Sequence, residues 1–190
     1  MDLTVDSSAV LQQRLLAGEL DLAIRVEGID STKIASSAIA SYPVRWIARR
    51  GLLSRRTTGL AARVLQRPIL TFGRGTAPQV ALQSIVHTLA RQEQIRPEQT
   101  RVTCSPSVAA IVQLVRDGYG VACIPSLFVT DELQTGEFVE LALKPVPPPI
   151  IVSVCKPMNA SAMVNAAASA AHIACSTYCR TKRPDLVEAL

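Results

Sequence analysis

The sequence is poor in the residue types on which most enzymes and nucleic-acid-binding surfaces depend. Of its 190 residues only 4% are aromatic, and only two are histidine. Proteins that hold nucleic acid usually add aromatic stacking platforms or a recognition helix to their basic residues, so this composition disfavours direct nucleic-acid binding. His87 and His172 have no neighbouring nucleophile or carboxylate motif, and no nucleophile elbow is present. We therefore expect no catalytic residues and no enzymatic activity.

Metal and nucleotide motifs are also missing. Five cysteines are present, but no pair has the spacing of a zinc finger or ribbon. Cys175 and Cys179 stand four residues apart on an expected helix and could hold a metal in principle, yet no second ligand pair accompanies them, so reduced structural thiols are favoured. The "GRGTAP" stretch at residues 73–78 lacks the third glycine of a dinucleotide loop and the Gly-Lys-Ser/Thr of a P-loop. No metal or cofactor is predicted.

Targeting and membrane segments are not found. Met1 is followed by "DLTVDSS", which has neither the basic start nor the apolar core of a secretory leader. The alanine-rich stretch at residues 160–174 is too short and too polar for a membrane span. We expect a cytoplasmic protein without membrane contact.

Positive charge is what the sequence has in excess. The formal net charge is +5 and the pI is about 9.2, a balance that suits nucleic acid or an anionic ligand. Eight arginines crowd one segment and are interpreted mainly as a solvated basic face: Arg45, Arg49, Arg50, Arg55, Arg56, Arg63, Arg67 and Arg74.

Two stretches repeat one pattern, a helix that ends at a glycine and is followed by an apolar strand. In the first, Gly18 ends a helix and residues 21–26 form the strand. In the second, Ser107 caps a helix, Gly118 ends it, and residues 120–125 form the strand. Near-continuous apolar strands are typical of parallel sheets covered by helices on both faces. The pattern predicts two α/β lobes built on the same plan.

The remaining elements are predicted from periodicity and turn residues. Thr76 and Gln79 have the spacing of a capping box, which begins a further helix. An alanine-rich helix is expected at residues 161–176. Strands are expected at residues 2–6, 44–48, 67–72, 101–105, 132–141 (with an exposed turn) and 150–155.

The two repeated stretches resemble a known family. "LQQRLLAGELDLAI" (residues 11–24) and "SVAAIVQLVRDGYGVACIP" (residues 107–125) are similar to the signature stretches of the effector-binding domain of LysR-type transcriptional regulators. The resemblance covers nearly the whole chain. It implies an α/β fold with two Rossmann-like lobes, as in type 2 periplasmic binding proteins. Lobe I would comprise residues 1–42 and 145–190, and lobe II residues 43–144. A small anionic metabolite, such as an organic acid, would bind between the lobes.

The sequence departs from the family at its start. Family members begin with a helix-turn-helix domain that binds DNA and a linker helix that pairs the subunits, and neither precedes Met1. The first strand of lobe I is also missing. We expect a truncated fragment with weakened lobe I pairing, or with that strand supplied by another chain. DNA contact would require the absent domain, and a homo-oligomer, a dimer, is expected of the full-length regulator.

Ligand-binding residues are expected at the carboxyl ends of the strands, where helix N-termini offer free N–H groups to an anion. Arg74 could pair with a carboxylate, and the glycines beside it would let backbone approach closely. Simple capping remains the alternative for Ser107 and Thr76, and a solvated loop position for Arg74. A transport-type solute-binding protein is the alternative function. The predicted ligand-binding set is Arg25, Thr71, Gly73, Arg74, Gly75, Thr76, Ser105 and Ser107.

Overall fold

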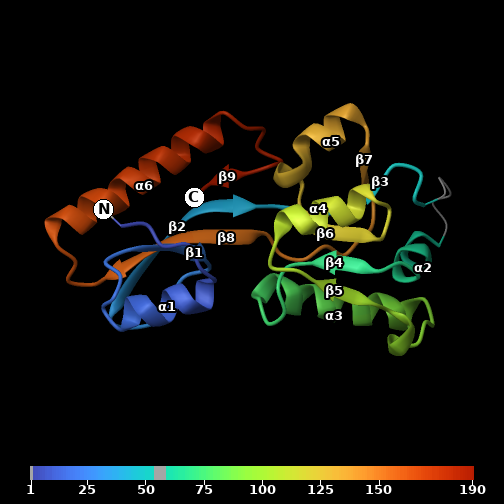
Figure 1. Ribbon diagram of the computed structural model, residues 1–190, viewed down its shortest axis with the longest axis horizontal. Helices are drawn as coiled ribbons and strands as arrows, with labels where there is room; N and C mark the ends of the chain where they lie inside the picture. Colours follow the sequence, from blue (N-terminus) through green and yellow to red (C-terminus); the bar gives the residue numbers. More distant parts are fainter. Residues whose placement is uncertain (1, 54–58) are drawn as a thin grey trace. The chain divides into compact units, whose positions relative to one another are not determined.

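The computed structural model describes residues 2–53 and 59–190, which fold into two compact units. Unit 1 is formed by Met1–Tyr42 and Ile150–Leu190, and unit 2 by Pro43–Pro149 (Figure 1). Arg55 and Arg56 of the arginine-rich segment lie outside the described residues. Within the described ranges, no helix combines the length and the apolar character needed to cross a bilayer.

Unit 1 is one antiparallel sheet with a helix on each face. The sheet has the order β1-β8-β2-β9, and each neighbouring pair is antiparallel. Helix α1 covers one face and α6 the other (Figure 1). Successive side chains of β8 alternate between the two faces, because Cys155 packs in the α1 cluster and Val154 in the α6 cluster. The elements are α1 (Ser8–Leu16), β1 (Ala23–Val26), β2 (Ile34–Tyr42), β8 (Ile150–Pro157), α6 (Ala162–Arg180) and β9 (Glu188–Ala189).

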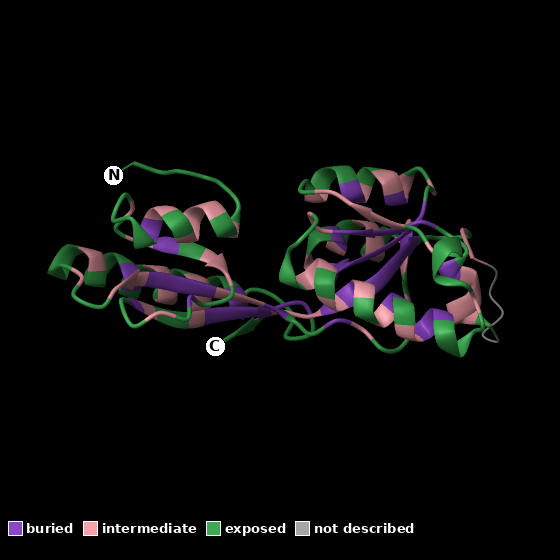
Figure 2. Cartoon of the chain, turned by 90° about the horizontal axis from the view of Figure 1, so that it is seen from below, coloured by how far each residue is buried: buried purple, intermediate pink, exposed green. Residues whose placement is uncertain are grey.

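Two expectations for this unit are wrong. Residues 2–6 form no strand and are exposed along their whole length (Figure 2). Leu3 and Val5 are 83% and 87% exposed. Alternating apolar residues make a strand only where a neighbouring strand satisfies their backbone groups, and no described strand pairs with this segment. The parallel plan expected for both lobes is not found here either, since the single partner of β1 among the described strands is β8, which runs antiparallel to it.

Hydrogen exchange should separate these segments. We expect the amides of residues 3–6 to exchange at nearly the rate of an unstructured peptide. The amides of β1 should be protected less than those of β8, which has strands on both sides. Exchange followed by mass spectrometry measures this. Protection of residues 3–6 equal to that of β8 would contradict the exposed N-terminal segment.

Unit 2 contains the predicted parallel strands. Its sheet has the order β5-β4-β6-β3-β7, in which β4 is parallel to β5 and β6, and β3 is antiparallel to β6 and β7. The elements are β3 (Val44–Arg49), α2 (Leu60–Leu65), β4 (Ile69–Thr71), α3 (Ala77–Gln92), η1 (Pro97–Gln99), β5 (Val102–Cys104), α4 (Val108–Arg116), β6 (Val121–Pro125), η2 (Ser126–Val129), α5 (Thr130–Thr135) and β7 (Phe138–Leu141).

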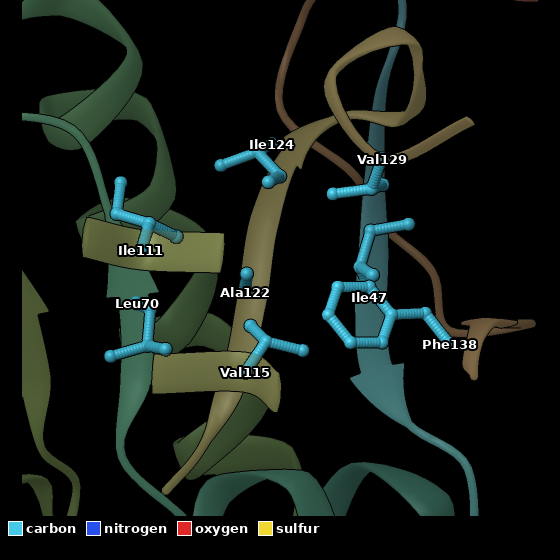
Figure 3. Close-up of a cluster of buried hydrophobic side chains, with 8 residues drawn as sticks. All are labelled: Ile47, Leu70, Ile111, Val115, Ala122, Ile124, Val129 and Phe138. Atoms are coloured by element: carbon cyan, nitrogen blue, oxygen red, sulfur yellow. The ribbon is translucent and has the colours of Figure 1, made fainter. Parts of the chain in front are cut away.

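A cluster of buried apolar side chains joins α4 to this sheet. Ile111 and Val115 are one turn apart on α4 and are fully buried against Leu70 of β4 and Ile47 of β3 (Figure 3). Burial of an aliphatic side chain of this size contributes about 1.5–3 kcal/mol. The cluster therefore fixes α4 on the sheet and places its N-terminus beside the end of β5.

The helix–glycine–strand pattern of the sequence is confirmed. Ser107 caps α4, and its Oγ accepts a hydrogen bond of 3.2 Å from the Ala110 N–H. Gly118 has φ of 72°, a left-handed conformation that costs a glycine little and ends the helix. Gly18 follows α1 with φ of 75° in the same role. The chain can then turn directly from α4 into β6, all five residues of which are buried.

Candidate functional site

Two loops of unit 2 meet where β4 and β5 end. Thr71 and Cys104 are partners in the parallel pair, and the Ser105 N–H donates to the Thr71 carbonyl at 2.9 Å. A Cβ added to Gly73 would lie 3.8 Å from Pro106, which shows how closely the two loops approach. We call residues 71–76 together with 105–109 the β4–β5 edge. Seven of the eight predicted ligand-binding residues lie there, so the structure brings them together.

The β5–α4 side of this edge is held in place by serine hydroxyls. Ser105 Oγ accepts from the Ser107 N–H at 3.1 Å and donates to the Ser107 carbonyl at 3.2 Å. Ser107 in turn caps the Ala110 N–H. The N–H groups of Val108 and Ala109 belong to the first turn, where a helix supplies no carbonyl partner. Free N–H groups of this kind, together with the positive end of a helix dipole, are suited to an anion.

The β4–α3 side differs from its prediction, because the capping box is not formed. Thr76 Oγ1 donates to the Gly73 carbonyl at 2.8 Å instead of accepting from an N–H of the helix. Gln79 Oε1 accepts from the Gly75 N–H at 3.0 Å instead of from Thr76. Gly75 has φ of 80°, so the loop turns back on itself and brings this N–H to the glutamine. Pro78 has no N–H, so the second residue of α3 cannot donate to an anion.

Thr71 is the buried polar residue of the edge. It is the last residue of β4 and only 1% exposed. Its Oγ1 is buried and has no hydrogen-bond partner within the described residues. An unsatisfied buried hydroxyl costs about 1–3 kcal/mol, and such groups are uncommon unless they serve a purpose.

The two predicted arginines do not share one unit. Arg74 is exposed at the tip of the β4–α3 loop and takes part in none of the ion pairs found among residues 2–53 and 59–190. Arg25 belongs to unit 1, where its guanidinium donates to the carbonyls of Ser8, Glu27 and Gly28 at 2.7–3.3 Å. These bonds give Arg25 a local role in holding the loop after β1, and its contact with a ligand remains a prediction.

Free N–H groups are expected at helix N-termini, but the two residues that carry them at α4 are not in the predicted set. Val108 and Ala109 offer N–H groups, yet their side chains are a valine and an alanine and carry no polar signal. The available signal was their position directly after the capping Ser107, because the first turn after an N-cap always has free N–H groups.

Comparison with known proteins identifies the family. The profile described as LysR substrate binding domain matches residues 1–174. No curated protein matches the sequence significantly. Identities with similar solved structures are below 25%, so these show the fold alone.

Three regulatory domains of known structure illustrate that fold. MetR, a LysR family regulator from N. meningitidis, is 17% identical with a TM-score of 0.63, over 94% of this chain and 81% of that one. CcmR from Synechocystis, in complex with 2-PG, is 18% identical with a TM-score of 0.67, over 91% and 82%. HypT from Salmonella typhimurium, bromide ion-bound, is 13% identical with a TM-score of 0.67, over 89% and 78%.

The resemblance of the two signature stretches is thus confirmed by a match over most of the chain and by the α/β fold. This chain belongs to the LysR substrate-binding domain family, the effector-binding domains of LysR-type transcriptional regulators.

Proposed function

We propose that the β4–β5 edge of unit 2 binds the effector, and that the effector is a small organic anion. The observation that carries the proposal is the combination, at one edge, of a capped helix N-terminus and a buried hydroxyl that has no hydrogen-bond partner among the described residues. A carboxylate placed there would accept from the Val108 and Ala109 N–H groups. Thr71 Oγ1 would gain a partner from the same ligand. Arg74, at the exposed tip, would add a charged donor.

One of the similar structures supports the choice of an anion, and a second supports the choice of a small molecule. HypT was solved bromide ion-bound, and bromide is an anion. The CcmR regulatory domain was solved in complex with 2-PG, a small molecule. The net charge of +5 of the present chain also favours anionic over cationic ligands.

A thermal-shift screen with a panel of small organic acids tests the proposal. We expect at least one acid to raise the midpoint of unfolding, because a ligand that binds only the folded state stabilises it. Ser107→Asp should abolish that shift, since aspartate keeps the N-cap but places a negative charge where the anion binds. Ser107→Asn caps the helix without charge and is the matched control. Equal ligand shifts in the two variants would place the anion elsewhere.

Thr71→Val adds a test that does not alter charge. Valine keeps the volume of threonine and removes a hydroxyl that has no partner, so we expect the free protein to gain about 1 kcal/mol of stability. Ligand affinity should fall by about 10-fold, because the ligand loses one hydrogen bond worth about 1.4 kcal/mol. Unchanged affinity together with raised stability would remove Thr71 from the site.

We propose further that the effector signal is passed to DNA by a helix-turn-helix domain of the same regulator and that the regulator is a homo-oligomer. A transport-type solute-binding protein is the alternative, and the family match disfavours it. Catalysis is also disfavoured, because the matching family and the similar structures are regulatory domains.

A further inference from the structure

Helix α6 carries two cysteines on the face that packs against β2. Cys175 and Cys179 stand four residues apart, so their side chains lie on the same side of the helix one turn apart. The Cys175 Sγ donates to the Ile39 carbonyl of β2 at 3.4 Å. Cys179 is only 6% exposed, whereas Cys175 is half-buried and can be reached from solvent. The pair therefore lies at the boundary between the apolar interior and water.

Tyr42 at the end of β2 and Tyr178 of α6 are other titratable groups beside the two thiols. Burial raises the pKa of Cys175, and the neighbouring Cys179 raises it further through charge and a hydrogen bond between the two side chains. Burial also raises the pKa of Tyr42 at the end of β2, and Cys175, Cys179 and Tyr178 add to that shift.

A disulfide does not fit this spacing. Side chains four residues apart on a helix have Cβ atoms about 5–6 Å from each other. A disulfide requires about 3.5–4.5 Å between its Cβ atoms, so Cys175 and Cys179 could form one only by distorting α6. Two metal–sulfur bonds of about 2.3 Å each, by contrast, let one ion join sulfurs up to about 4.6 Å apart. A single bridging ion therefore suits the pair better than a direct bond.

We propose that Cys175 and Cys179 form a two-coordinate thiolate site for a soft monovalent metal ion, Cu(I). Binding breaks two S–H bonds, forms two metal–sulfur bonds and releases two protons, without any change of oxidation state. Thiolates select soft ions of this kind. A closed zinc site needs four ligands, and no cluster of three or more His, Cys, Asp or Glu suited to a metal occurs in the part of the chain that the structure describes.

The surroundings favour an ion of low coordination number. Cys175 packs with Ile39, Val154 and Ala168, which supply no oxygen or nitrogen ligand from their side chains. Two thiolates and one Cu(I) ion together carry one negative charge. This charge lies near the negative end of the α6 dipole, which destabilises it. The positive charges of Arg180 and Lys182 at the end of the helix offset this unfavourable effect of the dipole. Lys182 Nζ lies 5.2 Å from the centre of the Tyr178 ring, one residue from Cys179.

Anaerobic titration of the reduced chain with Cu(I) against a coloured Cu(I) chelator tests the site. We expect each chain to remove one Cu(I) ion from the chelator. Cys175→Ser and Cys179→Ser should each weaken binding by more than about 100-fold, a larger loss than removal of an outer-shell partner causes. Cys104→Ser is the matched control, since Cys104 is also half-buried and lies in unit 2. Equal affinity in all three variants, or no withdrawal by the parent chain, would overturn the proposal.

Alkylation of the parent chain gives a readout that needs no variant. With Cu(I) bound, we expect Cys175 to be protected from iodoacetamide while Cys104 still reacts, as located by peptide mass spectrometry. Cys123 should stay unmodified with and without the ion, because burial raises the pKa of its thiol far above the usual range. Protection of Cys104, or reaction of Cys175 at the same rate in both states, would also overturn the site.

Discussion

Replacing Trp46 with alanine is expected to lower the free energy of unfolding of unit 2 by about 4 kcal/mol. Trp46 is the single tryptophan of the chain and is fully buried in β3, between β6 and β7. Its Nε1 donates to the Pro145 carbonyl at 3.0 Å, which ties the segment after β7 to the sheet. The substitution removes the largest buried side chain and leaves that carbonyl unpaired. Since small domains have only about 5–15 kcal/mol in total, unit 2 should become marginal.

Urea unfolding followed by far-UV circular dichroism measures this loss, because the variant has no tryptophan fluorescence. Trp46→Phe is the control, since it keeps an aromatic ring but not the donor to Pro145. We expect it to cost less than alanine does, about 1–3 kcal/mol, the usual penalty for an unsatisfied buried acceptor. A loss below 1 kcal/mol for alanine would mean that the sheet does not depend on this side chain.

The second large effect is expected from Gly120→Ala, at the turn between α4 and β6. A Cβ at this position would lie 2.2 Å from the Pro68 carbonyl oxygen and 3.0 Å from its carbon. That oxygen cannot move away freely, because it accepts from the Val121 N–H at 2.9 Å beside the β4–β6 pair. One extra methyl group must therefore displace backbone, and we expect a loss of about 3 kcal/mol.

Gly73→Ala provides the matched control for this steric argument. A Cβ there would meet only Pro106 and Thr76 at 3.8–3.9 Å, which is ordinary van der Waals contact. We expect its free energy of unfolding to change by less than about 0.5 kcal/mol. Equal midpoints for the two alanine variants in thermal or urea unfolding would contradict this argument, because they would show that the backbone near Pro68 accommodates the added methyl group at little cost in stability.

The elements predicted from the sequence are those in which local signals and burial agree. Helix α4 has a capping serine, an apolar stripe and a glycine stop, and all three are confirmed. Strand β2 was missed, although it is nine residues long and pairs with β8 along most of its length. Its "IASSAIASY" sequence contains small and polar residues without a clean alternation, so only pairing with a strand from the far end of the chain makes it a strand.

In the candidate site, too, the local capping signal is confirmed, whereas the contacts that depend on loop geometry are not. Ser107 was predicted as a cap, and its hydrogen bond to the Ala110 N–H confirms it. The Thr76–Gln79 capping box was wrong because the left-handed Gly75 turns the loop and presents a different N–H to the glutamine. Such a choice between neighbouring donors depends on loop geometry, which spacing does not encode.

The sequence by itself determined the family, the α/β class and the strand–loop–helix segments that offer anion donors, because caps, glycine stops and apolar periodicity act within a few residues. Only the tertiary structure decided three features of the described residues: unit 1 is antiparallel throughout, residues 2–6 pair with no strand, and the buried Thr71 hydroxyl has no hydrogen-bond partner. The reason is physical: backbone pairing and burial depend on segments far apart in the chain, and no local pattern specifies which of them meet.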